Sequence, residues 1–366
     1  MRTAHRRLVV ALVLGVLALA GCDGSSDSSA PAPGTAAATT DTTTDTASAP
    51  ATDPVPDRST GATPSPPPVP VRRDRLVPQP ADARDDRPDL YADGCQVAPD
   101  SDQPTGCAYG ASAEDATATI AVIGDSKSGQ WSTALQRLAE TRGWRVLIYT
   151  KSGCAAVAVP MSMSGEEYTS CTRYDRTVSA ELVAEPVDLL LTSNTSDSAH
   201  VTDLAPGEDA NKASLDAFVE GEKKAWRTWI EAGNRVAVIS DIPRPTSEGR
   251  FFDVPRCVAK HRDYLEQCSF DRSDGEALSG RTGQVRGIEE MGAVDVTPAL
   301  LGEEVPGAAD APLAWIDPLE VICPGETCLP TDGRVLVYRE GSHLTDTYVS
   351  SLTDRIGAVM TALGLP

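Results

Sequence analysis

The stretch TATIAVIGDSKSGQW, Thr117 to Trp131, joins an apolar run to a turn that carries an acid, two hydroxyls and a lysine. Residues 117–123 predict a buried strand, because they are short, apolar and partly β-branched. Residues 129–143 follow with large apolar side chains at helical spacing, and residues 145–150 are again aliphatic and β-branched. This part of the chain therefore predicts a strand, a helix and a second strand in succession.

The same alternation continues to the end of the chain. Further strands are predicted at 187–192, 235–240, about 294–296 and 334–338, and further helices at 171–185, 210–232 and 348–363. Parallel neighbouring strands need crossover connections, which helices supply. We therefore expect an α/β fold, a three-layer sandwich with a mostly parallel central sheet.

The N-terminus has the features of an export signal. Three arginines precede the apolar run 8–20, which is too short to span a bilayer but suits the core of a secretory signal. The run ends in Leu19-Ala20-Gly21-Cys22, which resembles the lipobox of bacterial lipoproteins. We expect residues 1–22 to be a lipoprotein signal peptide and Cys22 to be lipidated, which would anchor the exported protein to the outer face of the cytoplasmic membrane. An ordinary secretory signal with a chance cysteine is the alternative.

Composition separates a tether from a folded part. Residues 23–85 are rich in Ser, Thr, Pro and Ala and have few large apolar side chains, so they predict a disordered tether. Residues 86–366 are enough for one well-filled core. The formal net charge is −21, and no Lys/Arg cluster interrupts the acidity of the folded part. Nucleic acid is therefore not an expected partner.

The cysteine count suits an oxidising compartment. Setting Cys22 aside for lipid leaves eight of the nine cysteines. They form four sequence-local couples: Cys95 with Cys107, Cys154 with Cys171, Cys257 with Cys268, and Cys323 with Cys328. Disulfides between these neighbours are a hypothesis from proximity, because eight cysteines allow about 105 pairings. A zinc site is the alternative, but there is no Cys-x-x-Cys and there are few histidines. We expect no metal and no cofactor.

Chemistry-bearing residues follow the predicted strands. Ligands bind at the carboxyl ends of the strands in parallel sheets, where Ser126, Gly153, Asn194, Asp241 and His343 are expected. A serine becomes a nucleophile when a base takes its proton, another group orients that base, and donors bind the oxyanion. Ser126 lies where a helix N-terminus favours negative charge. The alternative role for Ser126 is to cap the turn.

His343 is the candidate base. It lies between the last predicted strand and the last helix, whereas His200 and His261 fall in polar, loop-like stretches. Glu340 precedes it by three residues and can turn back to one ring nitrogen, as the acid of a serine triad does. A structural histidine and a solvated loop carboxylate are the alternatives.

Gly124-Asp125-Ser126 and Glu340-x-x-His343 together resemble motifs of the SGNH hydrolase and acyltransferase superfamily. The similarity runs from about Thr117 to the C-terminus and is specifically to extracytoplasmic SGNH domains that serve membrane acyltransferases in the O-acylation of bacterial polysaccharides. The resemblance implies that Ser126 is the nucleophile and that its amide helps to form the oxyanion hole. It also implies that His343 is the base and Glu340 its acid.

The remaining blocks depart from the family pattern. Gly153 matches the second block, whose glycine offers a further amide to the oxyanion. Asn194 matches only the asparagine of the third block, usually Gly-x-Asn-Asp, in which it is the side-chain donor. A glutamate replaces the aspartate of the usual Asp-x-x-His block, and relatives often have histidine at the position of Lys127.

The expected function is that of a lipid-anchored serine O-acyltransferase or esterase. It would act through an acyl-serine intermediate on acyl groups, expected to be acetyl, of cell-envelope glycans. Because the chain lacks a multi-helix acyltransferase segment of its own, transfer implies a membrane acyltransferase partner that supplies the donor. A catalytically inactive SGNH fold that binds glycans is the alternative, favoured by Glu340 and the incomplete third block.

Overall fold

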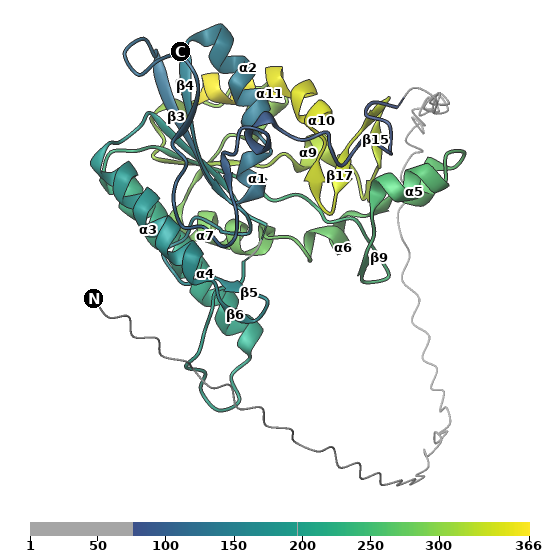
Figure 1. Ribbon diagram of the computed structural model, residues 1–366, viewed down its shortest axis with the longest axis horizontal. Coiled ribbons are helices and arrows are strands. Elements are labelled where there is room, and N and C mark those ends of the chain that lie inside the picture. Colours follow the sequence, from purple (N-terminus) through teal and green to yellow (C-terminus); the bar gives the residue numbers. More distant parts are fainter. Residues whose placement is uncertain (1–75, 196) are drawn as a thin grey trace, which may run out of the picture. The chain divides into compact units, whose positions relative to one another are not determined.

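The computed structural model describes residues 76–195 and 197–366, which contain one mixed sheet flanked by helices (Figure 1). The predicted signal peptide, Cys22 and most of the predicted tether lie outside the described residues. The central sheet has the strand order β1 (Gln96–Val97), β4 (Trp144–Lys151), β3 (Ala118–Gly124), β7 (Leu189–Ser193), β8 (Val236–Ile239), β13 (Leu313–Ile316), β12 (Val294–Asp295). These strands are parallel, and β2 (Cys107–Gly110) pairs with β4 in the antiparallel direction.

The sheet is buried on both faces, which explains why its strands are continuously apolar. Every residue of β7 and β8 is buried. Along β3, Ile120 and Val122 belong to the apolar cluster on one face, whereas Ala121 and Ile123 belong to the cluster on the other. The alternation follows from the two-residue period of a strand.

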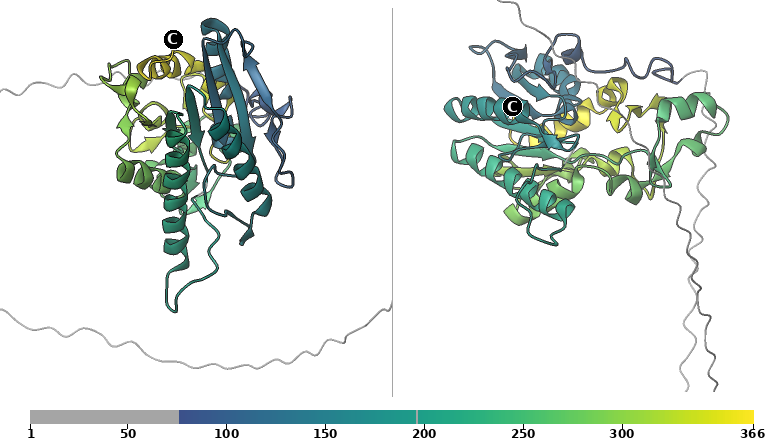
Figure 2. Two further views of the ribbon diagram at one scale, coloured as in Figure 1. Left: turned by 90° about the vertical axis from the view of Figure 1, so that its left-hand side faces the viewer. Right: turned by 60° about the horizontal axis from the view of Figure 1, so that its bottom comes forward.

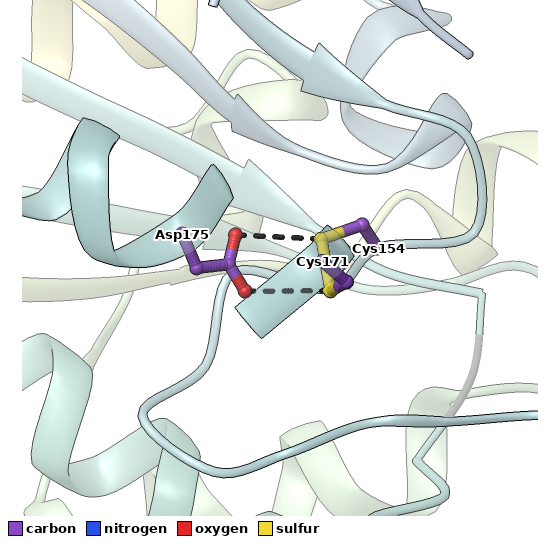
Figure 3. A group of neighbouring side chains, drawn as sticks. All are labelled: Cys154, Cys171 and Asp175. Carbon is purple, nitrogen blue, oxygen red and sulfur yellow. Dashed lines mark hydrogen bonds between the residues drawn. A yellow bond between two sulfur atoms is a disulfide. The ribbon is translucent and has the colours of Figure 1, made fainter. Parts of the chain in front are cut away.

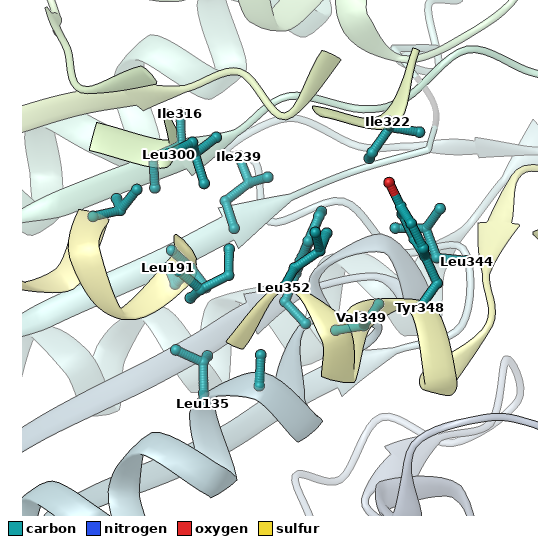
Figure 4. Packing of buried hydrophobic residues seen from close by; sticks show 14 of the residues in the cluster. Leu135, Leu191, Ile239, Leu300, Ile316, Ile322, Leu344, Tyr348, Val349 and Leu352 are labelled. Carbon is teal, nitrogen blue, oxygen red and sulfur yellow. The ribbon is translucent and has the colours of Figure 1, made fainter. Parts of the chain in front are cut away.

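Helices form the two outer layers (Figures 1 and 2). One layer contains α2 (Ser132–Arg142), α10 (Asp346–Ser351) and α11 (Thr353–Ala362), and the other contains α3 (Thr169–Ala184), α4 (Ala210–Glu231) and α7 (Arg281–Met291). Figure 4 shows the first layer, where Leu352 and Val349 pack near Leu191 and Ile239 of the sheet. The predicted α/β sandwich with a mostly parallel sheet is confirmed.

Shorter elements connect these layers. The short helices are α1 (Ser126–Gly129), α5 (Val254–Lys260), α6 (Arg272–Glu276), α8 (Thr297–Leu300) and α9 (Leu319–Ile322), with 3-10 turns at Asp89–Tyr91, Leu265–Cys268 and Ala308–Asp310. The small antiparallel pairs are β5 (Ser162–Met163) with β6 (Glu166–Glu167), β9 (Thr246–Ser247) with β10 (Arg250–Phe251), β11 (Phe270–Asp271) with β14 (Thr327–Cys328), β15 (Thr331–Asp332) with β16 (Val335–Leu336), and β17 (Tyr338–Glu340) with β18 (His343–Leu344).

The last predicted strand, 334–338, is not part of the central sheet. Its residues fall in β16 and β17, which belong to two separate hairpins. The sheet position between β8 and β12 is taken by β13, a four-residue strand that was not predicted from the sequence. Four apolar residues are too few to establish a period, so β13 is recognised only through its pairing with β8 and β12.

The folded part extends beyond the predicted boundary at residue 86. Leu76 is buried, and the main chain of Val77 bonds to the β15–β16 hairpin, through Val77 N to Arg334 O at 2.9 Å and Leu336 N to Val77 O at 3.0 Å. Residues 76–85 were assigned to the tether from composition, because a short paired segment changes the average amino-acid composition of the surrounding region very little. The pairing partner lies far along the chain, where composition cannot reveal it.

Four disulfides join the cysteines of the described residues: Cys95–Cys107, Cys154–Cys171, Cys257–Cys268 and Cys323–Cys328. These are the neighbour pairs that sequence proximity favoured. Because disulfides persist in oxidising compartments, they indicate an extracytoplasmic location. Among the helices of the described residues, none has the length and apolarity needed to cross a membrane.

Candidate active site

The register of the sheet brings three turns to one edge. Gly124, the last residue of β3, is opposite Thr150 of β4 and Ser193 of β7. The residues that follow these positions therefore emerge at the same carboxyl edge. Ser126, Gly153 and Asn194 lie on these three turns, as the sequence predicted.

Only glycine fits at the end of β3. Gly124 has a φ of +130°, and a Cβ there would lie 2.5 Å from Ser128 Oγ and 2.6 Å from Ser193 O. The space is occupied by Ser128, whose hydroxyl accepts the Ser193 amide at 2.7 Å. The glycine of the Gly-Asp-Ser motif therefore allows the turn after β3 to be joined directly to β7.

Asp125 connects the turn carrying Ser126 to the turn carrying Asn194. Its Oδ1 accepts the Lys127 amide at 2.8 Å, which caps helix α1, and its Oδ2 accepts the Thr195 amide at 2.8 Å. Burial raises the pKa of Asp125 to about 6, although the two amide hydrogen bonds oppose this rise. Asp125 therefore does more than close a local turn.

Ser126 and His343 are in hydrogen-bond contact. The distance between His343 Nε2 and Ser126 Oγ is 2.7 Å, although the two residues are 217 positions apart in the sequence. Ser126 begins α1, and His343 begins β18 in the C-terminal hairpin. A hydroxyl at this distance from an imidazole nitrogen can pass its proton to the ring.

The ring of His343 is oriented by main chain rather than by the expected carboxylate. Glu340 and His343 are paired residues of the β17–β18 hairpin, and the main chain of Glu340 hydrogen-bonds to the His343 side chain. The Glu340 carboxylate instead accepts a hydrogen bond from Arg339 Nη1 at 2.7 Å and is 44% exposed. The predicted carboxylate–imidazole contact is therefore wrong for this structure, because the neighbouring guanidinium binds the acid.

The environment of His343 favours a neutral ring. Burial is the main cause that lowers its pKa well below the usual range, and the positive charges of Lys127, Arg339 and Arg244 lower it further. The hydrogen bond to the main chain of Glu340 acts in the opposite direction. A neutral imidazole whose Nε2 faces a hydroxyl is the form that can act as a base.

Asn194 is held by a residue that the sequence analysis missed. Gln284, a buried residue of α7, donates from Nε2 to Asn194 Oδ1 at 3.0 Å, and its Oε1 accepts the Asp241 amide at 2.7 Å. This fixes the Asn194 carboxamide at the carboxyl edge. A single glutamine within a helix carries no local signal of such a role, because its partners follow β7 and β8.

Gly153 lies on a turn fixed by a disulfide. It has a φ of +63°, and the next residue, Cys154, is bonded to Cys171 of α3. Asp175 lies against the bridge, with its carboxylate oxygens 3.5 Å from Cys154 Sγ and 3.6 Å from Cys171 Sγ (Figure 3). Burial raises the pKa of Asp175 well above its usual range, so the group can donate a proton to sulfur. The bridged sulfurs provide no thiolate for a metal.

Two main-chain amides at this edge have no acceptor within the part of the chain that the structure describes. Among residues 76–195 and 197–366, none accepts a hydrogen bond from the amide of Ser126 or of Gly153. A donor of this kind is able to bind an oxyanion. Ser126, Gly153 and Asn194 lie on adjacent turns at the carboxyl edge, as the predicted arrangement of donors requires.

A parallel α/β sandwich with serine and histidine in contact at the carboxyl edge of its sheet defines a protein of the SGNH type. The model of the family described as "SGNH domain (fused to AT3 domains)" matches residues 94–357, and the chain belongs to this family. No curated protein sequence matches the chain. Among solved structures, it is similar to the periplasmic domain of a lipopolysaccharide acetyltransferase of Salmonella ser. Paratyphi A, with 15% identity, a TM-score of 0.45, and coverage of 68% of this chain and 85% of that chain.

Membership of this family supports an enzyme that forms or breaks acyl esters. The family description also links such domains to AT3 domains, which supports an association with membrane acylation systems.

Proposed function

We propose that the protein is an extracytoplasmic serine O-acyltransferase or esterase that acts on acetyl groups of cell-envelope glycans. The observation that carries this proposal is the 2.7 Å contact between His343 Nε2 and Ser126 Oγ at the carboxyl edge of the sheet. Family membership supports the acyl chemistry. The lipid anchor at Cys22 is part of the proposal and rests on the N-terminal sequence alone.

In the first half of the reaction, Ser126 Oγ attacks the carbonyl carbon of the acyl donor. The hydroxyl proton passes to His343 Nε2, and the carbonyl becomes a tetrahedral oxyanion. When the bond to the leaving group breaks, His343 returns the proton to the leaving oxygen or sulfur. The products of this half are the free alcohol or thiol of the donor and an acyl ester on Ser126.

In the second half, an acceptor hydroxyl attacks the acyl ester, and His343 takes the acceptor's proton. Collapse of the new tetrahedral intermediate releases Ser126, which recovers a proton from His343. A glycan hydroxyl as acceptor gives O-acyl transfer, whereas water gives hydrolysis. The family's link to AT3 domains favours transfer, with a separate membrane acyltransferase delivering the acyl group to this domain.

The oxyanion is assigned to donors on the three adjacent turns. The amides of Ser126 and Gly153 have no protein acceptor among the described residues and are the main-chain donors of the proposal. The carboxamide of Asn194, oriented by Gln284, is the side-chain donor. These groups are fixed by the sheet and by α7, so they need little rearrangement as negative charge develops.

An inactive glycan-binding protein is the second candidate. It is favoured by the position of the Glu340 carboxylate, which binds Arg339 rather than the ring of His343. In such a protein the Ser126–His343 contact would be a structural remnant, and glycan binding would not depend on the hydroxyl of Ser126.

The test compares the full-length chain with its Ser126→Ala variant. Release of the chromophore from a chromogenic acetyl ester is measured, alone and with an acetylatable oligosaccharide whose product is analysed by mass spectrometry. We expect the native chain to consume the ester and the variant to lose this activity. Equal rates in the two proteins under both conditions, together with equal glycan binding, would reject the enzyme and favour the binding protein.

A further inference from the structure

A single buried lysine joins the segment of Ser126 to the segment of His343. The side chain of Lys127 has 0% exposure, and its Nζ lies 3.0 Å from Asp241 Oδ1. The same ammonium donates to the carbonyl oxygen of Ser342 at 2.6 Å. Because Lys127 directly follows Ser126 and Ser342 directly precedes His343, one side chain links the backbones that carry both reacting groups.

Asp241 is itself held from two sides. Its Oδ2 accepts the Gly280 amide at 2.9 Å, and its own amide donates to Gln284 Oε1 at 2.7 Å. Both charged side chains of the Lys127–Asp241 pair are completely buried. The position of the lysine is therefore set by a carboxylate anchored at the end of β8 and by α7, not by solvent.

A buried ion pair contributes little to stability compared with well-packed apolar residues of similar size. The pair is costly to bury, and removal of one partner leaves an unpaired charge in the interior. Stability alone is thus a weak reason for a lysine at position 127. Its contacts beside Ser126 and His343 point to a role in the reaction.

The pair also sets the charge around the imidazole. Among the cations, Lys127 lowers the pKa of His343 most, and Arg339 and Arg244 lower it further. Arg339 is bound by Glu340, and Arg244 donates to Thr195 Oγ1 at 2.8 Å. Asp241 is the carboxylate that partly neutralises Lys127. The charge state of the pair therefore acts directly on the proton affinity of the ring.

We propose that Lys127, anchored by Asp241, is a positioning residue that holds together the two segments carrying Ser126 and His343. This inference rests on the proposed serine chemistry. Lys127 does not touch the reacting carbonyl; it acts through the main chain on both sides of the site and through its charge.

The test measures the rate at which a fluorophosphonate labels Ser126 in the full-length chain as a function of pH. Labelling forms an Oγ–phosphorus bond, releases fluoride and passes the hydroxyl proton to His343, so it needs neither a natural donor nor a water acceptor. The labelling rate falls at low pH, where His343 is protonated, and this fall is the acidic limb of the profile. Lys127→Met leaves the Asp241 carboxylate near the His343 ring, which favours the protonated ring, so the acidic limb should move to higher pH. Asp241→Asn leaves an unpaired ammonium, and the limb should move to lower pH.

The maximal labelling rate should fall about 10- to 100-fold in each single variant, because small displacements of reacting groups have effects of this size. The double variant Lys127→Met with Asp241→Asn contains no unpaired buried charge. Its rate loss should be smaller than the product of the two single losses. If a single variant does not fold, the double variant still tests the proposal. Positioning by Lys127 requires that Ser126 is labelled more slowly in the double variant than in the native chain.

Lys223→Met is the matched control. Lys223 is also a largely buried lysine, but it pairs with Glu220 and Glu290 on α4 and α7. Its loss should reduce thermal stability without moving the pH profile. Profiles of the Lys127 and Asp241 variants that coincide with those of the native chain and the control would overturn the inference. Absence of label on Ser126 in the native chain would instead reject the proposed function itself.

Discussion

Replacement of Glu340 by glutamine distinguishes a main-chain-oriented histidine from a conventional triad. The Glu340 carboxylate is 44% exposed and binds Arg339, whereas the His343 ring is hydrogen-bonded to the main chain of residue 340. The substitution keeps the backbone and the side-chain length. The ring should therefore keep its orientation and its tautomer in the Glu340→Gln variant.

The expected magnitude follows from the exposure of the ion pair. Arg339 is only 2% exposed, but the glutamine oxygen can still accept its hydrogen bond, so the substitution removes only the charge at the end of the pair that is 44% exposed. That charge contributes about 1 kcal/mol, which corresponds to a rate change of about fivefold. Removal of the acid from a serine triad costs about 10⁴-fold in kcat. The two possibilities differ by more than three orders of magnitude, which far exceeds the error of a rate measurement.

The assay is hydrolysis of a chromogenic acetyl ester, with fluorophosphonate labelling of Ser126 as a second readout. Glu320→Gln provides a matched control, since Glu320 is 48% exposed and pairs with Arg272 at 3.0 Å. We expect both variants to retain activity within about fivefold of the native chain. A loss of 10³-fold or more for Glu340→Gln alone would refute the main-chain orientation of His343 and restore the carboxylate as the third member of the site.

Three further predictions follow from the surroundings of the site. Replacing both Cys154 and Cys171 by serine should lower the free energy of unfolding by about 3 kcal/mol, given a sequence separation of 17 residues; an unchanged denaturant midpoint would contradict this. Burial raises the pKa of Asp125 from 3.8 to about 6, so between these pH values the folded state keeps a proton that the unfolded state has lost. The contribution of Asp125 to the free energy of unfolding should therefore fall by about 3 kcal/mol as the pH rises from 3.8 to about 6. The difference in unfolding free energy between the native chain and Asp125→Asn should therefore change between these pH values, whereas a constant difference would refute the shift. Asn194→Ala should reduce kcat about 100-fold with little effect on KM, and a loss below about threefold would exclude its carboxamide as an oxyanion donor.

Much of the architecture is predictable from local sequence because its central strands are long and apolar. The strand expected at 117–123 corresponds to β3, and the helix expected at 210–232 corresponds to α4. β13 was missed because four residues carry too little periodicity to separate a strand from a loop. Residues 334–338 have strand composition, but their hydrogen bonds are made in hairpins outside the sheet.

Some residues of the candidate active site were likewise predictable from the sequence, and others were not. Ser126 and His343 were predicted because each stands in a short motif at the end of an element, and the fold brings them into contact. The partner of the Glu340 carboxylate depends on competition between Arg339 and the imidazole, which sequence spacing cannot settle. The Lys127–Asp241 pair and the position of Gln284 depend on residues far apart in the chain, and neither leaves a local pattern.

The most direct measurement is the labelling of the full-length chain by a fluorophosphonate, with the modified residue located by peptide mass spectrometry. A serine activated by histidine predicts a single label on Ser126, with a rate that falls at least about 10³-fold in the His343→Ala variant. Label on another residue, or an equal rate on Ser126 with and without the imidazole, would contradict a reacting Ser126–His343 pair.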